Sequence, residues 1–178
     1  MLERVASLPV ATVAVVSGSA MGGGCGLAAA CDRVIAAEDA TFAMPEVTLG
    51  VAPAQIAPFV VRRAGARRAR WLMLAGARLK GSAAREAGLA DVVVPATELR
   101  GVLEAELRLL AAAEPAALRA TKRIVNRALE ASLATHLESI NALLDPHERL
   151  DCLVVLTQPW TVESGLITPT FKVRRNRI

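Results

Sequence analysis

Three consecutive glycines, Gly22 to Gly24, stand between an apolar run and a run of helix-forming residues, and a fourth glycine follows at Gly26. Inside a helix a glycine costs roughly 1 kcal/mol relative to alanine. Where a strand enters a helix through glycines, the unpaired N–H groups of the first helical turn and the helix dipole together attract an anion. Glycines also let a ligand approach that backbone closely. The pattern therefore predicts either a backbone anion site or tight packing between a helix and a strand.

The familiar anion-binding motifs do not match this stretch. No Gly-Lys-Ser/Thr sequence follows the glycines, as a phosphate loop would require, and their spacing is not the GxGxxG of dinucleotide sites. Ser19 lies between Gly18 and Ala20, which does not fit the GxSxG elbow of hydrolases. An oxyanion hole for a developing enolate or alkoxide is the catalytic interpretation that remains.

The amino-acid composition argues against several other classes of protein. The 178 residues are 53% hydrophobic, enough for one domain with a real core. The net charge of +4 is concentrated in the last seven residues, but two tryptophans, three phenylalanines and no tyrosine give few rings for stacking bases, so we expect no nucleic-acid partner. Three cysteines without a CxxC pair and two isolated histidines predict no disulfide framework, no metal site and a reducing, cytoplasmic location.

Residues 8–31 contain no charged side chain and are long enough to span a bilayer. Arg4 before them adds a likeness to a signal peptide. Pro9 and the glycines interrupt this apolar stretch, and a soluble α/β pattern continues after it. We therefore predict a buried strand, a turn and a buried helix here, with no membrane partner.

The elements that must position the glycines follow from apolar runs and helical periodicity. We expect strands at 11–16, 32–37 and 91–94, a turn at 17–21, and extended structure at 41–49 broken by Pro45. Helices are expected at 22–31, 54–64, 66–75, 81–88, 98–112 and 115–130, with another outlined by Leu133, Leu137, Ile140 and Leu144, and β-like segments at 150–157 and 166–173. Continuous apolar strands favour a parallel sheet covered on both faces. The fold class is α/β over residues 1–130, followed by a small α+β tail over 131–178.

The stretches PVATVAVVSGSAMGGGCGLAAACDRVIAAEDATFAMPEVTLG and ARRARWLMLAGARLKGSAAREAGLADVVVP resemble the enoyl-CoA hydratase/isomerase (crotonase) family, over about residues 1–130. The resemblance implies a crotonase-like core without its N-terminal third, an acyl-CoA substrate, and homotrimers or hexamers. Coenzyme A enters as part of the substrate, and no other cofactor is implied. The N–H of Gly23 would hold the thioester oxygen, the second donor falling upstream of Met1. Further implied substrate-binding residues are Met21, Gly22, Gly24, Gly26 and Pro53.

The family usually uses two carboxylates, and the resemblance places one at Gly26, where it is absent, and one at Glu46, where it is present. A single glutamate suits an isomerase that moves one proton, or hydratases that lack the first glutamate. GVAPAQIAPFVVRRAG resembles isohexenylglutaconyl-CoA and 3-methylglutaconyl-CoA hydratases, which implies hydration of a branched unsaturated acyl-CoA. Arg62 or Arg63 then either meets the second carboxylate of that substrate or lies on a solvated helix face. Isomerisation and a non-catalytic CoA-binding fragment stay as alternatives, and we expect weak activity from this chain alone.

From residue 131 the sequence HLESINALLDPHERLDCLVVLTQPWTVESGLITPTFKVRRNRI resembles the C-terminal end of AMP-forming long-chain acyl-CoA synthetases. In those enzymes a late lysine contacts the carboxylate and α-phosphate during adenylation, and the resemblance places Lys172 at that position. The phosphate loop and the adenine-binding segment of a synthetase are missing from this sequence. We therefore expect Lys172 to be idle.

Overall fold

The computed structural model describes residues 1–141, with side chains described as far as residue 129. Residues Met1–Ala131 form one compact unit. Its strands are β1 (Val13–Val16), β2 (Ser19–Met21), β3 (Arg33–Ala37), β4 (Thr41–Ala43), β5 (Arg78–Lys80) and β6 (Val92–Val94). The helices of the described residues are α1 (Leu2–Ala6), α2 (Gly23–Ala30), α3 (Ala57–Ala64), α4 (Ala66–Ala75), α5 (Gly81–Glu86), α6 (Leu99–Ala111) and α7 (Pro115–Asn141), with short 3-10 helices η1 (Pro45–Leu49) and η2 (Ala96–Glu98).

Two three-stranded sheets organise the described residues. The first has the order β1-β3-β6 and is parallel throughout, with Val13 opposite Arg33 and Ile35 opposite Val92. The second has the order β2-β4-β5, in which β2 and β4 are parallel and β5 is antiparallel to β4. Each sheet receives its strands from distant parts of the sequence, so both depend on the crossovers through α2 and α3–α4.

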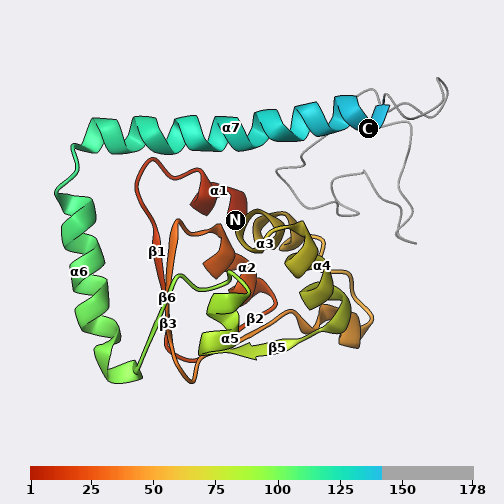
Figure 1. Cartoon of the computed structure of the whole chain (residues 1–178), viewed down its shortest axis with the longest axis horizontal. Helices are drawn as coiled ribbons and strands as arrows, with labels where there is room; N and C mark the ends of the chain where they lie inside the picture. Colours follow the sequence, from red (N-terminus) through yellow and green to blue (C-terminus); the bar gives the residue numbers. More distant parts are fainter. Residues whose placement is uncertain (142–178) are drawn as a thin grey trace. The chain divides into compact units, whose positions relative to one another are not determined.

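The core lies around β3, the central strand of the parallel sheet. Val34, Ile35, Ala36 and Ala37 are all fully buried, as a continuous apolar strand requires when both faces of its sheet are covered. Figure 1 shows α6 along one face of this sheet, with α2 and α5 on the opposite face. Helix α2, and with it the glycine run, is thus held between the parallel sheet and α3.

The structure confirms the α/β prediction over this unit and corrects it in five places. Residues 19–21, predicted as a turn, form β2, because they pair with β4. The segment after Pro45, predicted as extended, is the 3-10 helix η1. Two helices predicted from residue 115 onward are one helix, α7. The prediction had no α1 and no β5. The β-like segments expected at 150–157 and 166–173 lie outside the described residues.

Candidate functional site

The chain turns from β2 into α2 at Gly22, whose backbone has φ +51° and ψ −117°. Residues with a Cβ are strained in this conformation. The Gly22 N–H donates to the Ala43 carbonyl oxygen at 2.9 Å, and the Gly22 carbonyl oxygen accepts from the Gly26 N–H at 3.0 Å. One glycine therefore ends the β2–β4 pairing and begins α2.

The N-terminus of α2 is open at Gly23 and Gly24. Both residues are exposed, and a Cβ added to either would meet no atom within 4 Å. Gly23 is the first residue of the helix, so its N–H has no helical carbonyl partner. Among the described residues, no backbone hydrogen bond outside the helices and strands uses this N–H. The amide is therefore available to a negative or partly negative oxygen of a ligand.

Glu46 brings a carboxylate to this helix start. It is the second residue of η1, after the buried Met44 and a proline that suits the first helical position. Its Oε1 lies 3.1 Å from the point that a Cβ on Gly22 would occupy. Its Oε2 is buried and has no hydrogen-bond partner within the described part of the chain. Buried polar oxygens without a hydrogen-bond partner are rare in proteins, and this one belongs to a carboxylate at the start of α2.

Cys25 adjoins this carboxylate on the buried side of α2. Burial first, and the charge of Glu46 second, raise the pKa of the Cys25 thiol to about 12. The thiol is only 1% exposed. It therefore stays protonated at neutral pH and contributes an apolar wall rather than a nucleophile.

Gly26 does not face open space, unlike Gly23 and Gly24. It is buried, and a Cβ there would lie 2.4 Å from Cγ2 of Ile56 and 3.2 Å from Cδ1 of Leu2. This packing does not fit the predicted role of Gly26 in contacting substrate. The α2 face that carries Gly26 is covered by the segment leading into α3, which the glycine spacing did not reveal.

The two other predicted substrate-binding residues lie at the ends of neighbouring segments. Met21 ends β2, opposite Ala43, and is half-buried. Pro53 is half-buried in the segment between η1 and α3, where its carbonyl oxygen accepts the N–H groups of Ile56 and Ala57. Their contact with substrate stays a prediction.

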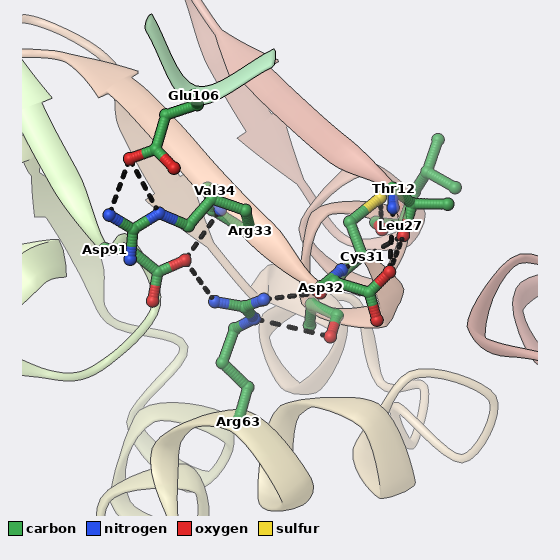
Figure 2. Close-up of polar contacts among 10 residues, drawn as sticks. Thr12, Leu27, Cys31, Asp32, Arg33, Val34, Arg63, Asp91 and Glu106 are labelled. Carbon is green, nitrogen blue, oxygen red and sulfur yellow. Dashed lines mark hydrogen bonds and ion pairs between the residues drawn. The ribbon is translucent and has the colours of Figure 1, made fainter. Parts of the chain in front are cut away.

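Arg63 binds the opposite end of α2, as Figure 2 shows. Its guanidinium donates to the carbonyl oxygens of Ala29 and Cys31 and to Oδ2 of Asp91. The side chain of Arg63 is 10% exposed. Because its donors are occupied about one helix length from Gly23, Arg63 does not meet a substrate carboxylate at the glycine run, and it is not on a solvated face either. Arg62 beside it is exposed, and two adjacent arginines carry no local pattern that would tell the bound one from the solvated one.

Two cavities lie away from the glycine run. One of about 440 Å³ is bordered mainly by α7 and reaches Ala11 and Asp32. The other, of about 230 Å³, adjoins Arg62, Arg63 and the end of α2. Neither is lined by Gly23 or Glu46.

No helix within residues 1–141 combines the length and apolar character needed to cross a bilayer. In the same part of the chain, no three His, Cys, Asp or Glu side chains come together as metal ligands would. Lys172 lies outside the described residues, as does the part of the predicted tail beyond residue 141.

Comparison with known proteins shows what this chain is similar to. The sequence model of the family described as enoyl-CoA hydratase/isomerase matches residues 1–147, which includes the first part of the predicted tail. A probable enoyl-CoA hydratase of Mycobacterium bovis is 39% identical over 132 residues, which cover 74% of this chain and 51% of that protein. The 2,3-dehydroadipyl-CoA hydratase of Escherichia coli is 34% identical over 170 residues, covering 91% of this chain and 63% of that protein.

Among solved structures, the enoyl-CoA hydratase from Bacillus anthracis matches with a TM-score of 0.71 and 33% sequence identity. The match covers 77% of this chain and 54% of that one. The chain spans about half the length of the curated relatives it matches.

Proposed function

The chain belongs to the enoyl-CoA hydratase/isomerase (crotonase) family, and from that premise we propose that its α2 and η1 form a site that adds water to an unsaturated acyl-CoA. One observation carries the proposal. The Glu46 carboxylate, with one buried oxygen lacking any partner among the described residues, lies against Gly22, next to the open N–H of Gly23. A proton-transfer group and an oxyanion donor thus meet at one helix start.

In the proposed reaction, the oxygen of water adds to the β-carbon of the enoyl group. The electron pair of the double bond moves onto the thioester oxygen, where the Gly23 N–H stabilises the negative charge. Glu46 takes a proton from the water and returns one to the α-carbon, so that one carboxylate serves both transfers. The net product carries hydroxyl on the β-carbon and hydrogen on the α-carbon. Coenzyme A takes part only as a portion of the substrate, and no other cofactor is needed.

We propose a branched acyl group with a second carboxylate as the preferred substrate class. Support comes from the likeness of residues 50–65 to glutaconyl-CoA-type hydratases, and from the similar E. coli protein, whose named substrate is a dicarboxylic acyl-CoA. Arg63 is not the residue that binds this carboxylate, because its guanidinium is bound at the other end of α2.

The test replaces Glu46 by glutamine and follows the loss of enoyl-thioester absorbance with crotonyl-CoA and with 3-methylglutaconyl-CoA. Since Oε2 has no partner in the described residues, Glu46→Gln should fold as well as the parent and lose hydration. The matched control is Glu98→Gln, which changes an exposed carboxylate in η2 and should leave the rate unchanged. Equal rates in Glu46→Gln and parent would exclude the proposed role.

Two alternatives have their own outcomes. If the chain converts a 3-enoyl-CoA to its 2-enoyl isomer without hydrating it, the single carboxylate serves an isomerase. If calorimetry detects CoA binding but neither reaction occurs, the chain is a CoA-binding fragment. Assembly into trimers or hexamers stays a prediction. Exposed apolar side chains such as Leu49, Trp71 and Leu74 are candidates for the contact surface between subunits, because burying them there would remove apolar area from water.

A further inference from the structure

Strand β1 lies at one side of the parallel sheet in the described part of the chain. Its neighbour there is β3, with Val13 opposite Arg33 and Val16 opposite Ala36, and no strand of the described residues pairs with its other side. The outer side of such a strand presents backbone N–H and C=O groups on which another strand can pair. The sheet therefore leaves one edge of β1 open.

The hydrogen bonds show which residues of β1 face that edge. The Arg33 N–H donates to the Thr12 carbonyl oxygen at 3.1 Å, so the backbone groups of Thr12 point toward β3. This direction alternates along a strand, so in the parallel register Ala14 also points toward β3. The N–H and C=O groups of Val13 and Val15 then point outward. Among the described residues, no backbone hydrogen bond outside the helices and strands uses these groups.

The sequence of β1 carries none of the features that usually block an open edge. Edge strands of natural proteins are commonly protected by a lysine, a proline or a bulge. Residues 8–31 contain no charged side chain, and β1 contains no proline. Its four residues pair one to one with β3, without a bulge. The side chain of Val15 is 40% exposed, so a strand that paired here would also cover apolar surface.

We propose that β1 is the docking site for β1 of a second copy of this chain, in antiparallel pairing about a two-fold axis. An axis through Ala14 brings Val13 of one copy opposite Val15 of the other. Because both residues turn their N–H and C=O groups outward, each such pair exchanges two hydrogen bonds. Ala14 meets its own copy at the axis as a non-hydrogen-bonded pair, in which side chains come closest, and a methyl group suits that position.

The edge suits a second copy because a two-fold contact places one patch against itself. A charged strand would repel its own copy, whereas the uncharged span 8–31 does not. The outward groups of Val13 and Val15 complement each other once one strand is reversed. The pairing joins two β1-β3-β6 sheets into one continuous sheet and leaves neither β1 edge open. This proposal concerns assembly and does not depend on the proposed function.

The first test is amide hydrogen exchange of the full 178-residue chain, followed by NMR at increasing chain concentration. The Val13 and Val15 amides should exchange fast in dilute solution. When roughly nine-tenths of the chains are paired, both should exchange roughly tenfold more slowly, because only the unpaired chains exchange. The Ala14 and Val16 amides point toward β3 in either state and are the internal control. Exchange at Val13 and Val15 that does not depend on concentration would overturn the proposal, whether the edge is open or covered by another part of the same chain.

The second test measures self-association by sedimentation equilibrium. Val15→Lys places a charge on the edge and should weaken association by roughly tenfold or more. The matched control is Val61→Lys, which adds the same charge to α3 at a valine of similar exposure, 38%, and should associate like the parent. Equal association of Val15→Lys and parent would overturn the proposal, as would a trimer that leaves the Val13 and Val15 amides unprotected. Should Val15→Lys not fold, the exchange of these amides in the parent still decides.

Discussion

Replacing Arg63 by alanine removes a side chain that is 10% exposed and that joins α3, the end of α2 and the β6 edge of the parallel sheet. The guanidinium donates to Oδ2 of Asp91 at 3.0 Å and to two carbonyl oxygens of α2 and its cap. Hydrogen bonds to charged groups contribute about 1.5–3 kcal/mol each, and breaking a buried ion pair costs about 3–5 kcal/mol.

For the Arg63–Asp91 ion pair we take the lower end of the range of about 3–5 kcal/mol. Asp91 is 29% exposed, and the same Oδ2 keeps a hydrogen bond from the Val34 N–H at 2.7 Å. Solvent and this N–H partly compensate the carboxylate once Arg63 is gone. We therefore expect Arg63→Ala to lower the free energy of unfolding by about 3 kcal/mol. Arg63→Lys should be intermediate, because lysine keeps the charge and loses the planar fork of donors.

Arg62→Ala is the control, since it removes an identical side chain from the preceding, exposed position of α3. It should change the free energy of unfolding by no more than about 0.5 kcal/mol. Urea denaturation followed by circular dichroism measures both variants, with equal m-values as the condition for comparison. Indistinguishable midpoints for the two variants would refute the reasoning. A stable Arg63→Ala chain that selectively lost turnover of a dicarboxylic acyl-CoA would instead restore Arg63 as a substrate ligand.

Three further predictions concern α2 and its neighbours. Gly22→Ala should lower the free energy of unfolding by about 1–3 kcal/mol, because alanine is strained at φ +51°. Gly24→Ala has open space around the added Cβ and should raise it by up to about 1 kcal/mol. Similar urea midpoints for the two variants would contradict this. Lys122→Ala should speed amide exchange in α7, because Nζ of Lys122 lies 2.6 Å from Oδ2 of Asp32; unchanged exchange would show that this ion pair does not hold the helix. Burial raises the pKa of the Cys25 thiol from 9.0 to about 12, so the unfolded chain loses this proton first as the pH rises. Stability should therefore fall from pH 9 to 12 more steeply in the parent than in Cys25→Ala, as the urea midpoints would show.

Much of the fold followed from local patterns in the sequence. The strands near residues 13–16, 33–37 and 92–94 were predicted from continuous apolar runs, and α2 from the residues after the glycines. Residues 19–21 were missed as a strand because their pairing with β4 is set by residues twenty-two positions away. The prediction placed Glu46 on extended structure, although Pro45 at a first helical position also fits the helical turn that is found.

The candidate site was predictable where it depends on backbone chemistry and not where it depends on packing. A glycine run after a strand indicates an open helix start, and Gly22–Gly24 form one. That Gly26 differs from its neighbours depends on Ile56, thirty residues later, which no local pattern connects to it. The same holds for Arg63, whose partners come from α2 and from the residue before β6.

The Arg63 contacts have a consequence for the far end of α2. A helix of eight residues moves nearly as a rigid body, so a shift of its last carbonyl groups along the axis shifts its first amide by a similar distance. Oxyanion donors act only within a few tenths of an ångström around 2.7–3.1 Å. In the proposed site, the position of the Gly23 amide would therefore depend in part on an arginine of α3 that binds the other end of α2.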